Sequence, residues 1–230
     1  MVDYMAAIKK PFGNLQAAGI GTIVGLIPLV NLLLNGYGLQ TAKKTLNKDN
    51  SLPGWTNNIG DLIVKTIMAI IIGIIYSIPA TVVIVIGAMA AITPILGAIS
   101  SGSADALMPA IMGALAVGGI FFLIGALLAL LGAVLTIMGL MNYLKEGKFG
   151  AAFAIGKLFK KVFTVAFILA FIVSIVYSLV VLVVAVFISG VLNIIPVLGF
   201  FIGLLVMGLA SYMLTVTTMT IYAQVYNETP

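Results

Sequence analysis

Four long segments without a charged residue limit what this chain can fold into more than any other feature of the sequence. They cover residues 11–42, 66–104, 106–144 and 162–227. A helix crosses a bilayer with about 20 apolar residues, so each segment can cross once and the last can cross twice. Hydrophobic residues make up 63% of the chain and charged residues 7%, against about 45–50% and about 25% in a soluble domain. The sequence therefore predicts a single all-α domain, a polytopic transmembrane helical bundle.

The predicted spans are long, interrupted by prolines and separated by short polar segments. Proline removes a backbone hydrogen bond inside a helix, so Pro28, Pro79 and Pro94 predict kinks or breaks. We expect about five spans, together with short amphipathic interfacial helices. In order, the chain is predicted to contain an interfacial segment 1–12, span one 13–46, a polar loop 47–61, span two 62–96, a short loop 97–109, span three 110–143, a basic amphipathic segment 144–161, span four 162–190 and span five 195–226.

The lysines predict an orientation for these spans, with one conflict at the N-terminus. Lysines beside a span favour the cytoplasmic side, so loops 43–61 and 144–161 are expected to be cytoplasmic. Lys9 and Lys10 favour the same side, yet a single crossing by the first span would place them outside. That segment is therefore either one kinked crossing or a re-entrant segment broken at Pro28. We favour one kinked crossing, because a helix from 14 to 46 is long enough.

Glycine recurs at intervals of seven residues in the third span and of fourteen residues in the second. Small residues at such spacing let two helices approach closely in lipid. We therefore expect spans two and three to form a tight antiparallel hairpin. The same seam could instead pair two copies of the chain or admit a lipid chain. The predicted seam contains Gly73, Gly87, Gly118, Gly125, Gly132 and Gly139.

Lysines and the single tryptophan mark the predicted membrane–water interface. Arginine is absent, so all eleven cationic side chains are lysines, and the net charge is +5. Because these lysines flank apolar spans, we expect them to meet lipid headgroups, and we predict no binding of nucleic acid. Tryptophan is typical of the headgroup level. The predicted interface residues are Lys43, Lys44, Trp55, Lys157, Lys160 and Lys161.

A second candidate site lies at the proline break in the first span. Asn31, Asn35 and Tyr37 follow Pro28 closely and bring polar groups into an apolar segment. Buried carboxamides most often form hydrogen bonds between helices. The sharper hypothesis is that these three side chains line a cavity beside the break.

The sequence offers few groups for catalysis. Histidine and cysteine are absent, which removes the usual zinc ligands and thiolate chemistry. The six acidic residues lie in predicted loops or at helix ends, so no span buries the acid that an ion-coupled carrier usually needs. We therefore predict no enzyme activity, no catalytic residue, no metal site and no cofactor.

Several short motifs resemble one family. They are I-P-x-x-N at 27–31, G-Y at 36–37, L-P-x-W at 52–55, K-F-x-A-A-F at 148–153 and I-P-V-L-G at 195–199. This pattern resembles a family of uncharacterised archaeal integral membrane proteins, one of those named for a domain of unknown function. The resemblance implies a multi-helix protein of an archaeal cell membrane and supplies no catalytic residues.

These observations predict a non-catalytic membrane protein, either a scaffold, an accessory subunit or a lipid-organising protein. Its expected partners are membrane lipids and either further copies of the chain or another membrane subunit. The alternative is a transporter or channel for a small or lipophilic substrate, because proline-broken helices can line a substrate path.

Overall fold

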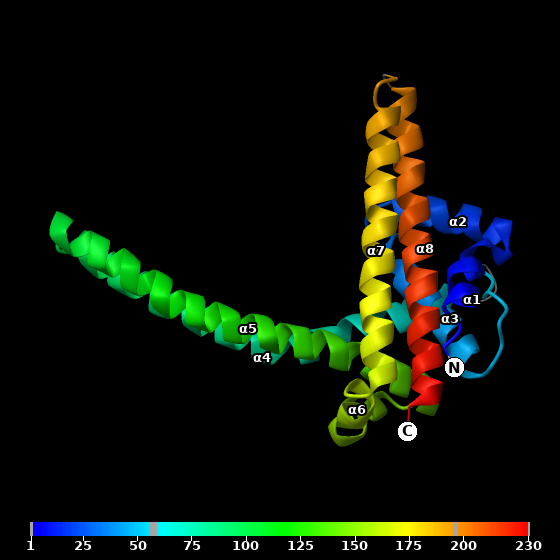
Figure 1. Ribbon diagram of the computed structural model, residues 1–230, viewed down its shortest axis with the longest axis horizontal. Coiled ribbons are helices and arrows are strands. Elements are labelled where there is room, and N and C mark those ends of the chain that lie inside the picture. The colour runs from blue at the N-terminus through cyan, green and yellow to red at the C-terminus, as the bar shows by residue number, and fades with distance from the viewer. Residues whose placement is uncertain (1, 56–58, 196, 230) are drawn as a thin grey trace. The chain divides into compact units, whose positions relative to one another are not determined.

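The computed structural model describes residues 2–55, 59–195 and 197–229, and these residues form helices and no strand (Figure 1). The all-α prediction is confirmed. In chain order the elements are α1 (Tyr4–Lys9), the 3-10 helix η1 (Lys10–Gly13), α2 (Leu15–Leu26), α3 (Leu32–Leu46), α4 (Ile59–Ser100), α5 (Ala104–Glu146), the 3-10 helix η2 (Phe149–Phe153), α6 (Ile155–Val162), α7 (Val165–Leu192) and α8 (Leu198–Glu228).

Four of these helices are long and apolar enough to cross a membrane. They are α4, α5, α7 and α8, with 42, 43, 28 and 31 residues. Helix α2 is also apolar, but its 12 residues extend only about 18 Å, which is less than the hydrocarbon thickness of about 30 Å. The structure thus supports a membrane-embedded helical protein.

The single bundle expected from the sequence divides into two compact units. The body unit contains Met1–Ile71 and Ile137–Pro230, and the hairpin unit contains Ile72–Thr136. The hairpin unit consists of the distal parts of α4 and α5, and the body unit contains all the other helices.

In the hairpin unit the turn between the helices is shorter than the loop 97–109 that we expected. Helix α4 continues through Pro79 and Pro94 to Ser100, and α5 begins at Ala104. A helix in lipid tolerates proline because neighbouring helices, side chains and local adjustments of the helix satisfy the backbone groups that proline frees. The turn is made at Gly102, whose φ of 68° is a left-handed conformation that glycine adopts without strain.

The glycines of the predicted seam lie where α4 and α5 approach each other in the hairpin unit. A Cβ atom added to Gly132 would lie 2.5 Å from the carbonyl oxygen of Tyr76. One added to Gly118 would lie 3.2 Å from Ala91 Cβ, and one added to Gly125 or Gly87 would overlap a side chain of the facing helix. Gly73 is less critical, because its nearest neighbour would be 4.0 Å away. Gly139 is buried in the body unit.

In the body unit α7 and α8 lie side by side, joined at their far end by a short turn (Figure 1, yellow and orange to red). Helix α7 begins at Thr164, whose hydroxyl accepts the backbone N–H of Phe167 at 3.2 Å and so caps the helix. Helices α1, α2 and α3 pack against α8. Helix α2 crosses α8 where Gly25 faces Gly208, and a Cβ added to Gly25 would lie 2.8 Å from the Gly208 carbonyl oxygen.

The first apolar segment does not form the single kinked helix that we expected over residues 14–46. It divides into α2 and α3, separated by residues 27–31, in which Leu29 has a φ of 69°. Lys10 Nζ donates a hydrogen bond to Thr45 Oγ1 at 2.7 Å, so the start of α2 and the end of α3 lie at the same end of the body unit. The alternative in which the segment turns back at Pro28 agrees with this contact, and it removes the conflict over Lys9 and Lys10.

Candidate functional site

One end of the body unit gathers most of the lysines, and we call it the basic end. It is formed by α1 and η1, the C-terminal turn of α3, the C-terminal turn of α5, α6 and the last turns of α8; both chain ends lie there (Figure 1). Direct contacts join these elements. Lys145 Nζ and Asn227 Nδ2 both donate to the carbonyl oxygen of Leu46, at 3.2 and 3.1 Å, and Asp3 N donates to Gln224 Oε1 at 2.9 Å.

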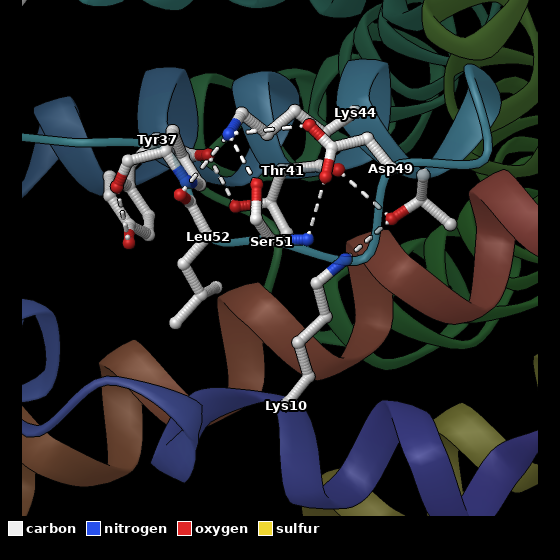
Figure 2. Close-up of polar contacts among 9 residues, drawn as sticks. Lys10, Tyr37, Thr41, Lys44, Asp49, Ser51 and Leu52 are labelled. Carbon is white, nitrogen blue, oxygen red and sulfur yellow. Dashed lines mark hydrogen bonds and ion pairs between the residues drawn. The ribbon is translucent and has the colours of Figure 1, made fainter.

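A network of polar contacts folds the loop after α3 (Figure 2). Lys44 Nζ donates to Ser51 Oγ at 2.6 Å and to the Leu52 carbonyl oxygen at 3.3 Å, and it lies 3.4 Å from Asp49 Oδ2. The backbone N–H of Ser51 donates to Asp49 Oδ1 at 2.8 Å. This N–H, the Ser51 hydroxyl and the Lys44 ammonium all lower the pKa of the Asp49 carboxyl. Lys44 therefore holds the loop, whereas Lys43 is exposed.

Lys10 reaches this network from η1 and is half-buried (Figure 2). Its ammonium donates a hydrogen bond to the neutral hydroxyl of Thr45. Burial lowers the pKa of the Lys10 ammonium to about 8; the Asp49 carboxylate opposes this shift and the Lys44 ammonium adds to it. Lys10 is thus a cation without full electrostatic compensation.

The three predicted interface lysines of α6 have different roles. Lys157 and Lys160 are exposed, and Lys157 Nζ forms an ion pair with Glu146 Oε1 at 2.6 Å, which raises the pKa of Lys157. Lys161 contradicts the prediction of a headgroup contact, because it is only 4% exposed. Its ammonium donates to the carbonyl oxygens of Thr229 and Tyr226 at 2.5 and 3.3 Å.

Lys161 instead caps the C-terminal end of α8. The last carbonyl groups of a helix have no partner within the helix, and a lysine placed there satisfies them and complements the helix dipole. Lys161 Nζ also lies 4.3 Å from the ring centroid of Tyr226, a cation–π distance. The pKa of Lys161 is lowered by burial and by the nearby Lys157.

Trp55 also contradicts its predicted position at the lipid headgroups. It is 8% exposed and its ring stacks on Tyr37 with a centroid distance of 4.1 Å. Its Nε1 donates to the carbonyl oxygen of Ala17 in α2 at 3.0 Å. Because the indole N–H finds this backbone partner, the whole side chain can be buried.

The three residues of the predicted cavity do not come together. Asn31 is exposed, and its Nδ2 donates to the carbonyl oxygen of Gly25 at 3.1 Å, which satisfies the end of α2. Asn35 is exposed and borders a groove of about 210 Å³ whose other lining residues are apolar. Tyr37 is fully buried, and its hydroxyl donates to the Pro53 carbonyl oxygen at 3.1 Å.

Another groove was missed by the sequence analysis. It measures about 220 Å³ and lies between α1 and η1, the loop after α3 and the last turns of α8. The sequence signal was the Lys9–Lys10 pair, which we interpreted only as a marker of orientation. The lining residues are Ala6, Lys9, Lys10, Asn50, Thr220 and Gln224.

Within the described residues, no three acidic side chains lie close enough together to hold a metal ion. Three of the acids are instead engaged with lysines. Asp49 pairs with Lys44, Glu146 pairs with Lys157, and Asp61 pairs with Lys65.

Comparison with known proteins places the chain in a family. Neither a search of curated proteins nor a search of solved structures gave a match. A family model described as "Protein of unknown function (DUF4013)" matches residues 20–194, which is more than half of the chain. The chain therefore belongs to the DUF4013 family of proteins of unknown function.

Proposed function

We propose that this protein is a non-catalytic, lipid-organising scaffold of a prokaryotic cell membrane, archaeal by its sequence resemblance, with its basic end at the cytoplasmic leaflet. The observation that carries this proposal is the packing around Tyr37. The ring of Tyr37 stacks on Trp55 and lies 5.9 Å from the ring centroid of Tyr212. These three rings fill the side of α3 where a transporter of the predicted kind needs an open cavity.

The basic end supports the lipid-organising part of the proposal. Exposed lysines near the surface of an anionic membrane each contribute about 1 kcal/mol of attraction. Lys43, Lys157 and Lys160 are exposed. Helix α6 also leaves Ile155 51% exposed, whereas its Leu158 and Val162 are buried within the protein. Lysines beside an exposed apolar side chain are typical of a segment at the membrane–water interface.

The arrangement of the acids supports the absence of catalysis. A catalytic carboxylate must be able to reach a substrate with a suitable protonation state. Asp49 accepts from the backbone of Ser51 and pairs with Lys44. Asp61 accepts from Gln40 Nε2 at 2.7 Å and pairs with Lys65. Both carboxylates are thus engaged in holding the fold.

A transporter is the second candidate, and one observation favours it. The chain between α2 and α3 is broken at residues 27–31, with a left-handed Leu29, and broken helices line substrate sites in many transporters. The groove beside Asn35 is the place where a substrate would bind under this proposal.

The lipid-organising proposal predicts selective retention of anionic lipid. In nanodiscs containing equal amounts of phosphatidylglycerol and phosphatidylcholine, we expect the protein to enrich phosphatidylglycerol in small discs. Replacing Lys43 and Lys160 with glutamine should reduce that enrichment, because about 1 kcal/mol of attraction is lost for each lysine. Lipid composition measured by mass spectrometry gives the result.

The matched control is Gln16→Ala, which changes an exposed polar residue of α2 without changing the charge. It should enrich phosphatidylglycerol as the unaltered protein does. Raising the salt concentration from about 0.1 M to about 0.5 M should weaken the enrichment by screening. Equal lipid composition in the presence and absence of the two lysines would contradict the proposal.

A further inference from the structure

We propose that the groove between η1, the loop after α3 and α8 binds a phosphate group, supplied by the headgroup of an anionic lipid. The inference rests on the proposed function, because it assigns a specific site within the basic end. The groove has a volume of about 220 Å³, which accommodates a phosphate group and its ester oxygens.

The chemistry of the lining residues is that of an anion site. Lys9 and Lys10 contribute ammonium groups and Asn50 contributes a carboxamide. Gln224 Oε1 accepts the backbone N–H of Asp3 at 2.9 Å, which leaves its amide nitrogen as a donor toward other groups. No carboxylate is among the lining residues. Charged donors and amide donors together are suited to phosphate oxygens.

Lys10 gives the strongest argument for a missing anion. A half-buried ammonium is unfavourable unless an opposite charge compensates it. The hydrogen-bond acceptor of Lys10 is the neutral Thr45 hydroxyl, at 2.7 Å. The nearest acid, Asp49, is held by the backbone N–H of Ser51 and by Lys44. An anion in the groove would complete the compensation of the Lys10 charge, to which Asp49 contributes only part.

The surroundings of the groove favour a lipid as the source of the phosphate. Large apolar side chains of α1, η1 and the start of α2 are exposed next to the two lysines: Met5 is 60%, Phe12 is 49% and Leu15 is 80% exposed. Apolar side chains beside lysines are typical of a segment that lies at the headgroup–acyl boundary. A lipid whose phosphate occupies the groove could place its acyl chains against these residues.

The test measures ligand-dependent thermal stabilisation of the detergent-purified protein with three probes. They are phosphatidylglycerol, a digalactosyl lipid that has no phosphate, and inorganic phosphate. A ligand that binds only the folded protein raises its melting temperature, and the stabilisation grows with the logarithm of the ligand concentration relative to Kd. We expect phosphatidylglycerol to stabilise the protein and Lys10→Met to weaken its binding by about tenfold, as for loss of a charged hydrogen bond.

Two further variants keep the test independent of folding. Lys160→Met removes an exposed charge from the same end without touching the groove. It should lower phosphatidylglycerol affinity by no more than about fivefold, the loss of about 1 kcal/mol for one surface lysine, and so by less than Lys10→Met. Asn50→Ala alters an exposed loop residue that lines the groove, so it should fold normally and still weaken binding measurably.

The pH dependence is a second readout. The groups that face Lys10 are Lys9, the Lys44 ammonium and the Asp49 carboxylate. Because burial lowers the pKa of Lys10 to about 8, phosphatidylglycerol affinity should fall as the pH rises above that value. Lys10→Arg should retain its affinity over the same range, because arginine stays charged.

The possible results separate the site from the broader function. Equal losses for Lys10→Met and Lys160→Met would overturn the groove site and leave diffuse attraction of anionic lipid, as in the proposed function. Equal stabilisation by the digalactosyl lipid and phosphatidylglycerol would overturn both. Inorganic phosphate that binds as tightly as phosphatidylglycerol would support the phosphate chemistry and overturn the lipid as its source.

Discussion

Replacing Tyr37 with alanine is expected to lower the free energy of unfolding of the body unit by about 3–5 kcal/mol, the usual cost of truncating a buried aromatic residue. Tyr37 is fully buried and contacts the rings of both Trp55 and Tyr212. It also joins α3 to the following loop through its hydroxyl. Denaturation followed by the fluorescence of Trp55, the only tryptophan of the chain, measures the change at the contact itself.

Tyr37→Phe is the matched control. It keeps the stacking on Trp55 and removes the hydroxyl, which donates to the Pro53 carbonyl oxygen at 3.1 Å and also interacts with the Tyr212 hydroxyl. One such hydrogen bond contributes about 1 kcal/mol, so this variant should lie much closer to the unaltered protein. If Tyr37→Ala costs no more than Tyr37→Phe, the three rings do not form the core that we describe.

Replacing Gly25 with leucine is expected to detach α2 from α8 and to cost about 3 kcal/mol, the upper part of the range for overpacking. A Cβ at this position would lie 2.8 Å from the carbonyl oxygen and 3.1 Å from the Cα of Gly208. Both atoms belong to the backbone, so no side-chain rotation can make room. The fluorescence of Trp55 should change, because its Nε1 donates a hydrogen bond to the carbonyl oxygen of Ala17 in α2. When α2 detaches, the indole should move into a more polar environment.

Gly19→Leu tests whether the effect of Gly25→Leu comes from the helix contact. Gly19 lies on the same helix, and a Cβ added there would meet no atom within 4 Å. Both substitutions raise helix propensity by about 1 kcal/mol, and both add the same apolar side chain. We expect Gly19→Leu to be neutral or stabilising, and a loss equal to that of Gly25→Leu would contradict the close packing of α2 on α8.

The helical class could be predicted because it depends on local sequence alone. A segment such as 162–227 without a charge has to satisfy its backbone within helices if it lies in lipid. The hairpin of α4 and α5 could be predicted for a similar reason, because the spacing of its glycines is visible in the sequence. The prolines were misleading at the turn: Pro94 and Pro109 lie inside helices, because a helix in lipid can continue past a proline.

The positions of Trp55 and Lys161 could not be predicted because their partners are distant in the sequence. The indole N–H of Trp55 donates a hydrogen bond to the carbonyl oxygen of Ala17, 38 residues away in the sequence. The ammonium of Lys161 donates a hydrogen bond to the carbonyl oxygen of Thr229, 68 residues away in the sequence. Residue type predicts an interface for both side chains, whereas long-range hydrogen bonds decide that they are buried. The groove at Lys10 was missed for the same reason, since it needs α8 and the loop after α3.

The central claim is that the segment from Lys10 to Thr45 turns back, so that the lysines of the body unit share one side of the membrane. The chain contains no cysteine, so single cysteines introduced one at a time can be labelled without background. Suitable positions are Lys9, Lys43 and Lys160 at the basic end, all exposed, and Ile194, which is 80% exposed beyond the far end of α7.

Labelling these variants with a membrane-impermeant thiol reagent in oriented vesicles tests the claim most directly. Lys9→Cys, Lys43→Cys and Lys160→Cys should react from the same side. Ile194→Cys should react from the other side, because the 28 residues of α7 extend about 42 Å. Reaction of Lys9→Cys and Lys43→Cys from opposite sides would show that the first apolar segment crosses the membrane, and it would contradict the account.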